Sequence, residues 1–202
     1  MKRASNSLWA IALVATGLFL ATPSAHAACT TDKPRDSLTY EDAQAIYDCL
    51  KDGMYENYNK GQKRWIPADI VEDYRNWKPA STLPADPGFH SERYLLAYVN
   101  PVGYDAYTEF AEDPTIPEGT VIVKESFSIT KKGKGKAGPL FIMQKAKAGS
   151  SPKTMDWYYM MVSAKGIPQA INVYQACNEC HVESFGFQGG LGYPVEEVRV
   201  TD

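Results

Sequence analysis

The sequence predicts an α+β fold, with an antiparallel β-sheet, flanking helices and a C-terminal helix that carries a cysteine motif. Helical patterns begin after residue 38, and four runs rich in β-branched and aromatic residues lie between residues 93 and 162. A further helical segment follows the last run. The chain shows no internal repeat, so we expect one domain.

Residues 1–27 are expected to be a secretory signal peptide. Lys2 and Arg3 precede a mostly apolar run of about 14 residues, and the small-x-small string Ala25-His26-Ala27 follows it. The run is shorter than the roughly 20 residues that span a bilayer. A retained anchor and a lipid-modified Cys29 are the alternatives. An exported protein is therefore predicted.

The composition is that of an ordinary soluble protein, with 44% of the 202 residues hydrophobic and 22% charged. Cleavage after residue 27 would remove two of the 21 basic side chains and none of the 24 acidic ones, which leaves 19 and 24. This balance argues against nucleic acid as a partner, because nucleic-acid binding needs a clustered positive surface. About 175 residues remain, enough for one good core.

The first helix is expected over residues 39–58. Thr39 is a capping residue with Asp42 three positions later, and apolar residues then recur at helical spacing. These apolar residues are Ala43, Ile46, Tyr47, Leu50, Met54 and Tyr58. A second helix is expected from Pro67 to Trp77, followed by an irregular segment, 79–88, that contains three prolines.

Strands are expected over residues 93–99, 120–129, 139–145 and 157–162. Asn100-Pro101 fits the cap and first turn of a helix over 101–112. Residues 131–136 contain four lysines and two glycines, and we interpret them as a solvated hairpin tip. Docking of an acidic electron-transfer partner is the alternative for these lysines. A helix over 168–180 completes the pattern.

Two of the four cysteines form a cofactor motif. Cys177-Asn178-Glu179-Cys180-His181 is the C-x-x-C-H signature of covalent c-type haem attachment. On a helical turn this spacing lets both sulfurs reach the two vinyl groups of one porphyrin, and the histidine lies beneath the iron. A thioredoxin-like pair would sit after an early strand, and a zinc site would need more ligands than His90 and His181 can add. One haem c is predicted, with His181 as its proximal iron ligand.

Cys29 and Cys49 are the remaining pair, and we expect them to form a structural disulfide. Oxidised cysteines persist in exported proteins. Closing a loop of about 20 residues should contribute about 3 kcal/mol in the chain-entropy account.

An open sixth position on the iron is favoured. No methionine follows His181, and core roles are preferred for the five methionines beyond the leader, Met54, Met143, Met155, Met160 and Met161. His90 could instead supply a second histidine ligand, or it could line the edge of a pocket. An open position would bind or transform a small ligand.

From Tyr74 to His181 the chain resembles the cytochrome P-460 family, which includes the cytochromes c′-beta. The matching pieces are Tyr-Arg-Asn-Trp at 74–77, Tyr-Val-Asn-Pro at 98–101, Pro-Glu-Gly-Thr-Val-Ile-Val-Lys-Glu at 117–125, Leu-Phe-Ile-Met-Gln-Lys at 140–145, Asp-Trp-Tyr-Tyr at 156–159, and the haem motif. Residues 67–202 are thereby interpreted as a P-460-like haem c domain, and residues 28–66 as an N-terminal helical extension.

The resemblance implies a periplasmic homodimer with one five-coordinate haem c. A periplasmic electron-transfer partner is a separate expectation. In hydroxylamine-oxidising members a lysine is cross-linked to the porphyrin edge, and that lysine corresponds to Lys124. Members without the cross-link bind nitric oxide. The resemblance therefore implies hydroxylamine oxidation or nitric oxide binding, and an electron carrier with a sixth protein ligand is the remaining alternative.

Lys124 and Glu125 lie in a strand whose alternation leaves their roles open. The odd positions 121, 123, 127 and 129 are apolar, which places Glu125 on the buried face and Lys124 towards solvent. If the even face instead lines the haem pocket, Lys124 reaches the porphyrin edge. Glu125 then either supports the haem site through a neighbouring residue or is a buried partner of another polar side chain. No acid occurs between Phe141 and Gly149, where Gln144 stands in place of a useful distal carboxylate.

Overall fold

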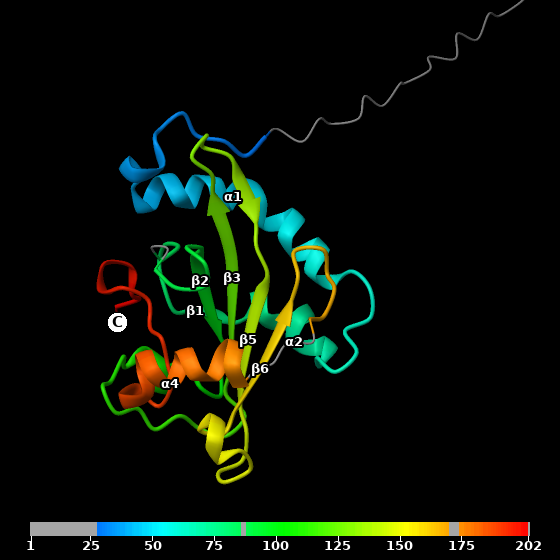
Figure 1. Ribbon diagram of the computed structural model, residues 1–202, viewed down its shortest axis with the longest axis vertical. Coiled ribbons are helices and arrows are strands. Elements are labelled where there is room, and N and C mark those ends of the chain that lie inside the picture. Colours follow the sequence, from blue (N-terminus) through cyan, green and yellow to red (C-terminus); the bar gives the residue numbers. More distant parts are fainter. Residues whose placement is uncertain (1–27, 86–87, 170–173, 202) are drawn as a thin grey trace, which may run out of the picture.

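The computed structural model describes residues 28–85, 88–169 and 174–201, and the expected signal peptide lies outside them. Its centre is a six-stranded sheet in the order β1-β2-β3-β5-β6, with β4 paired to β3 (Figure 1). All the strand pairs are antiparallel, which confirms the predicted fold class. The strands are β1 (Lys78–Pro79), β2 (Tyr94–Val99), β3 (Val121–Ile129), β4 (Gly135–Ala137), β5 (Leu140–Lys145) and β6 (Trp157–Val162).

The two helices before the sheet form where the sequence predicts them. Helix α1 (Tyr40–Asn59) begins with a complete capping box, in which Thr39 and Asp42 each accept a hydrogen bond from the other's backbone N–H. Helix α2 (Ala68–Asp73) follows Pro67 and continues as a 3₁₀ turn, Tyr74–Asn76. Within the described part of the chain, no helix combines the length and apolarity needed to cross a bilayer.

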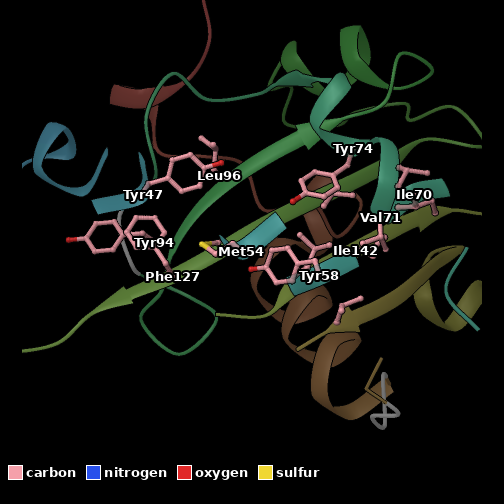
Figure 2. Packing of buried hydrophobic residues seen from close by; sticks show 14 of the residues in the cluster. Tyr47, Met54, Tyr58, Ile70, Val71, Tyr74, Tyr94, Leu96, Phe127 and Ile142 are labelled. Atoms are coloured by element: carbon pink, nitrogen blue, oxygen red, sulfur yellow. The ribbon is translucent and has the colours of Figure 1, made fainter. Parts of the chain in front are cut away.

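Both faces of the sheet are buried, each against a different part of the chain. On one face, side chains of β2, β3 and β5 pack against α1 and α2 (Figure 2). The opposite face packs a second apolar cluster, which includes Ile122, Met143 and Trp157, against Leu191 near the C-terminus. Because neighbouring residues of a strand point to opposite faces, the even-numbered side chains of β3 face this second cluster. Of the two alternatives left open for Lys124, the one in which it faces solvent is therefore wrong.

The helix expected over 101–112 is shorter in the structure, α3 (Tyr104–Thr108). Asn100 does not cap it, because its side chain accepts from the Val121 N–H at 3.0 Å and donates to the Gly119 carbonyl at 2.9 Å. Gly103 is the residue before the helix, and a Cβ there would lie 2.1 Å from the Thr120 side chain. Phe110, at φ +49°, stops the helix. Contacts with β3 therefore override the local capping signal.

The lysine-rich turn is solvated, as predicted, and contains one strand that the sequence pattern did not reveal. Lys131, Lys132, Lys134 and Lys136 are all exposed. Residues 135–137 nevertheless form β4, which pairs with the end of β3. A three-residue strand that contains a glycine and a lysine carries too little alternation to be recognised from sequence.

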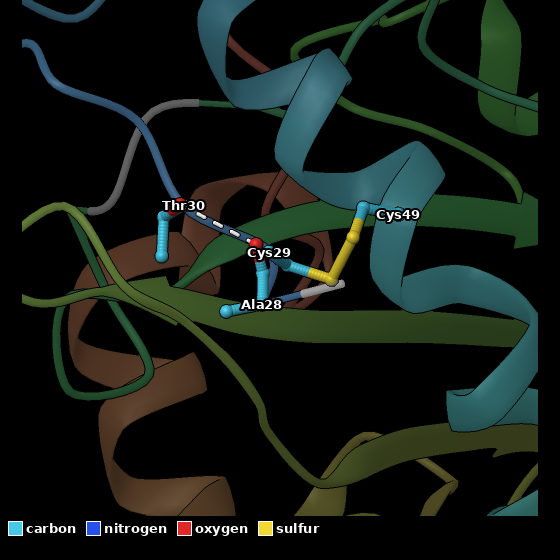
Figure 3. Close-up of a disulfide and its surroundings, with 4 residues drawn as sticks. All are labelled: Ala28, Cys29, Thr30 and Cys49. Carbon is cyan, nitrogen blue, oxygen red and sulfur yellow. Dashed lines mark hydrogen bonds between the residues drawn. A yellow bond between two sulfur atoms is a disulfide. The ribbon is translucent and has the colours of Figure 1, made fainter. Parts of the chain in front are cut away.

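The disulfide between Cys29 and Cys49 is present, as predicted. It joins the N-terminal segment to the middle of α1 across a Cα–Cα distance of 5.6 Å (Figure 3). The same segment is also tied to the hairpin, because the Cys29 carbonyl accepts from the Gly135 N–H at 2.7 Å and the Thr31 N–H donates to the Gly133 carbonyl at 2.9 Å. The disulfide therefore fastens to α1 a segment that is also hydrogen-bonded to the turn between β3 and β4 and to the start of β4.

Replacing both Cys29 and Cys49 with serine should lower the free energy of unfolding by about 3 kcal/mol, because the unfolded chain regains the entropy of a 20-residue loop. Urea unfolding of the haem-loaded protein measures this change. The haem-to-protein absorbance ratio serves as the control. It should not change, because α1 packs on one face of the sheet and Cys177 of the haem motif packs on the opposite face. An unchanged urea midpoint would contradict the prediction.

Candidate haem site

A cavity of about 380 Å³ lies between the sheet and the C-terminal helical segment, within the range typical of ligand pockets. The sheet supplies its wall in two cross-strand rows. In the first row Lys124 of β3 pairs with Phe141 of β5, which pairs with Met161 of β6. The second row is formed in the same way by Ile122, Met143 and Tyr159. The wall is thus apolar and aromatic, with one lysine.

The cysteine motif forms the facing wall. Cys177 lies on a π-helical turn, Tyr174–Asn178, and Cys180 and His181 lie on α4 (Glu179–Phe185). Both thiols are free, and all three side chains line the cavity. The motif therefore presents its two sulfurs and its imidazole to one space, as covalent haem attachment requires.

The helix that carries the motif differs from the expected span of 168–180. Pro168 forms a β-bridge with Val162, so the chain is still extended there, and residues 170–173 lie outside the described residues. Helical structure is described from Tyr174 and continues to Phe185. Phe185 also lines the cavity.

His181 is held in the tautomer that suits an iron ligand. Its Nδ1 lies 2.6 Å from the Gly190 carbonyl oxygen, which can only accept, so Nδ1 carries the proton. Nε2 then keeps the free lone pair that binds a metal. Burial, with the nearby charge of Lys124, lowers the pKa of His181 to about 4, so the ring is neutral at pH 7.

Lys124 is buried in the cavity wall, with 8% of its surface exposed. Its Nζ donates a hydrogen bond to the Gly192 carbonyl at 2.8 Å. Burial lowers the pKa of this amine to about 8. About one molecule in ten then carries a neutral amine at pH 7, against about one in three thousand for an ordinary lysine. The pocket placement of Lys124 is therefore the correct alternative.

Glu125, the next residue along β3, lies on the opposite face and is fully buried. Its carboxylate accepts from Tyr47 at 2.7 Å, from Arg75 at 2.8 Å and from Tyr74. Burial and the Glu125 charge raise the pKa values of both tyrosines, which keeps them protonated as donors. Glu125 is thus a buried partner that joins α1 and the Tyr74–Asn76 turn to β3. It does not face the cavity.

His90 lies in the cavity, on the segment that precedes β2. Its ring packs 4.5 Å from the ring of Phe141, and its centroid is 6.2 Å from that of His181. The described residues that line the cavity include no carboxylate, and Gln144 is not among them. Sequence reasoning left His90 open between an iron ligand and a pocket-edge residue. It named Phe141 and Tyr159 only as parts of the family pattern.

The residues of the cavity fit a haem group. Two buried polar atoms in its wall, Nδ1 of His90 and the hydroxyl of Tyr159, have no hydrogen-bond partner among the described residues. Buried polar atoms are nearly always paired, so a polar or metallic partner is missing from this space. The flat, apolar porphyrin ring suits the aromatic wall of the cavity, and its iron suits an imidazole ligand.

Comparison with known families agrees with this chemistry. The family described as Cytochrome P460 matches residues 71–185, more than half of the chain, from α2 to the end of α4. No curated protein matches the chain. The matched span includes Lys124, both thiols and His181. The chain belongs to the cytochrome P460 family and is a haem cytochrome.

Proposed function

We propose that this protein is a periplasmic monohaem c-type cytochrome that oxidises hydroxylamine at the axial position of the iron opposite His181. The observation that supports this function best is the buried amine of Lys124, which shares one cavity with Cys177, Cys180 and His181. A lysine in a haem pocket is costly to bury. It is therefore better explained by chemistry than by stability.

The chain's residues divide the work of holding the haem. The sulfurs of Cys177 and Cys180 would form the thioether bonds, and Nε2 of His181 would bind the iron, while the Gly190 carbonyl fixes the ring. The haem supplies the redox chemistry, and the protein supplies orientation, polarity and access. The walls formed by Phe141, Met143 and the other apolar side chains limit water around the reacting nitrogen compound.

Lys124 is the residue on which the reaction class depends. Only a neutral amine is a nucleophile, and burial has already raised the neutral fraction of Lys124 several hundredfold at pH 7. We propose that its Nζ would be joined to the porphyrin edge, where one C–N bond replaces one N–H bond of the amine and one C–H bond of the porphyrin; this is a two-electron oxidation, and a peroxide would be the oxidant. Such a bond would change the shape and electronics of the macrocycle, which tune haem reactivity.

A second candidate function is nitric oxide binding without catalysis. It is favoured by the lack of any carboxylate among the described lining residues, since hydroxylamine oxidation must release protons. In this alternative Lys124 keeps its hydrogen bond to Gly192 and forms no cross-link.

We also propose where the protein is located and which partners it has. The leader pattern of residues 1–27 supports export, and the disulfide is typical of an oxidising compartment. We also propose a homodimer and a periplasmic electron acceptor, on the family resemblance. The four exposed lysines of residues 131–136 could dock an acidic acceptor.

Replacing Lys124 with alanine should leave the haem attached, because the two thiols and His181 hold it independently. We expect loss of the porphyrin cross-link, a ferrous spectrum of ordinary haem c, and loss of hydroxylamine oxidation with nitric oxide binding retained. Optical spectra, mass spectrometry of the haem peptide and steady-state assays measure these outcomes. Lys147→Ala, at an exposed lysine outside both the cavity lining and residues 131–136, is the matched control. Identical spectra and activity in wild type and Lys124→Ala would leave the nitric oxide binder as the better function.

A further inference from the structure

A glycine-rich segment follows α4 at residues 189–192, beyond the residues that match the cytochrome P460 family. Its sequence is Gly-Gly-Leu-Gly, and we call it the glycine segment. Its last three residues are buried, and Leu191 belongs to the apolar cluster on the cavity side of the sheet. The proposed function assigns this segment only separate contacts with His181 and Lys124.

Two carbonyls of the glycine segment accept hydrogen bonds from cavity side chains that come from different elements. The Gly190 carbonyl accepts from Nδ1 of His181, on α4, at 2.6 Å. The Gly192 carbonyl accepts from Nζ of Lys124, on β3, at 2.8 Å. Two residues of chain span at most about 7 Å, so the imidazole and the amine are bound to one short piece of backbone. A displacement of this piece would change both hydrogen bonds.

Two further donors, neither of which lines the described cavity, hold the glycine segment in place. Nε1 of Trp157, on β6, donates to the Gly189 carbonyl at 2.9 Å. The hydroxyl of Tyr107, on α3, donates to the Gly192 carbonyl at 3.1 Å. Tyr107 is fully buried, and burial raises the pKa of its hydroxyl, which therefore stays protonated as a donor. Tyr107 thus fixes the same carbonyl to which Lys124 is bound.

The backbone of the glycine segment has a conformation that suits glycine alone. Gly189 and Gly190 have φ values of +62° and +82°, in the left-handed region where other residues are strained. A Cβ on Gly190 would also lie 2.6 Å from Cε of Met155, and a Cβ on Gly192 would lie 3.1 Å from the ring of Phe185. The absence of side chains at these positions therefore allows the segment to approach its neighbours closely.

We propose that the glycine segment is the common support of His181 and Lys124, and that Tyr107 is a positioning residue that acts through the Gly192 carbonyl. The hydrogen bond from Nδ1 to Gly190 makes the imidazole a stronger ligand for iron. Loss of either donor to Gly192 loosens the segment and weakens this hydrogen bond. The inference rests on the haem and the His181 bond of the proposed function, but not on the cross-link.

Vibrational spectra of the haem-loaded ferrous protein test this coupling. In Tyr107→Phe we expect the iron–histidine stretching band of the resonance Raman spectrum to move to lower frequency and the reduction potential to rise, because a weaker hydrogen bond leaves the imidazole a poorer ligand. Lys124→Met, which keeps a long side chain but has no N–H donor, should move the band in the same direction.

Tyr193→Phe is the matched control for Tyr107→Phe. The two rings belong to one aromatic cluster, with centroids 5.2 Å apart, but the Tyr193 hydroxyl donates to the Ala111 carbonyl at 3.1 Å and not to the glycine segment. The iron–histidine band of this variant should stay at the wild-type frequency. Where the cross-link forms, Tyr107→Phe should also slow its formation with hydrogen peroxide by about fivefold, the change that corresponds to one neutral hydrogen bond.

An iron–histidine band at the wild-type frequency in Tyr107→Phe would overturn the inference. An equal shift in Tyr193→Phe would do so too, because it would assign the effect to the aromatic cluster. If Tyr107→Phe fails to fold, Lys124→Met and the control still decide. Failure of the proposed function is distinct: a protein that forms no cross-link and oxidises no hydroxylamine, but whose band shifts in Tyr107→Phe and Lys124→Met alone, would leave the glycine segment as the common support.

Discussion

Replacing Cys177 and Cys180 together with alanine should abolish covalent haem attachment. After acid denaturation, the wild-type polypeptide should carry the mass of one haem, and the double variant should carry none. The reason is that the two sulfurs are the free thiols of the cavity wall and form the only thioether donors the motif offers. Intact-mass spectrometry gives an all-or-none answer.

The single variants sharpen this test. Cys180→Ala should retain haem through one thioether at Cys177, and Cys177→Ala through one at Cys180, each with a haem peptide of altered mass. The disulfide variant with serine at Cys29 and Cys49 is the matched control, because it changes two cysteines and leaves the cavity intact. Haem that dissociates from the wild type in acid would refute covalent attachment.

The second large effect is expected at Glu125. Replacement with alanine should lower the free energy of unfolding by about 3–5 kcal/mol, since removal of one partner from a buried ion pair leaves the other uncompensated. Arg75 would lose its closest carboxylate and keep the Lys51 carbonyl at 2.5 Å and the exposed Asp52 at 3.7 Å. Tyr47 and Tyr74 would each lose an acceptor. Urea unfolding of the haem-loaded protein measures the change.

Two comparisons separate the charge from the packing. Glu125→Gln keeps the shape and should cost less than Glu125→Ala, while Tyr47→Phe, which removes one donor, should cost about 1 kcal/mol. The haem spectrum should be unchanged in every variant that folds, because Glu125 faces away from the cavity. A cost below about 1 kcal/mol for Glu125→Ala would show that the cluster does not stabilise the fold.

The Glu125 cluster also bears on the haem site. Lys124 and Glu125 are adjacent in β3 and are buried on opposite faces, one in the cavity wall and one beneath α1. The carboxylate, which β3 carries, accepts hydrogen bonds from α1 and from the Tyr74–Asn76 turn, so it fixes the strand that also carries Lys124. The helical segment before residue 67 thereby supports the site without contributing a residue to the described cavity lining.

The sequence by itself determined those features that depend on neighbours along the chain. The capping pattern of Thr39 and Asp42 predicted the start of α1, and four β-rich runs predicted β2, β3, β5 and β6 almost to the residue. The spacing of Cys177, Cys180 and His181 predicted their common role, because C-x-x-C-H is a local arrangement. The pairing of Cys29 with Cys49 followed from the assignment of the other two cysteines to haem.

Only the tertiary structure decided what packs against each face of β3. Alternation showed that Lys124 and Glu125 point in opposite directions, but both faces of this sheet are covered, and a single strand cannot reveal what lies beyond its neighbours. The same limit applied to Asn100, whose side chain bonds to residues 119 and 121 and caps nothing. His90 shows it most clearly: 90 residues lie between it and His181 in the chain, and only folding brings the centroids of their rings to 6.2 Å.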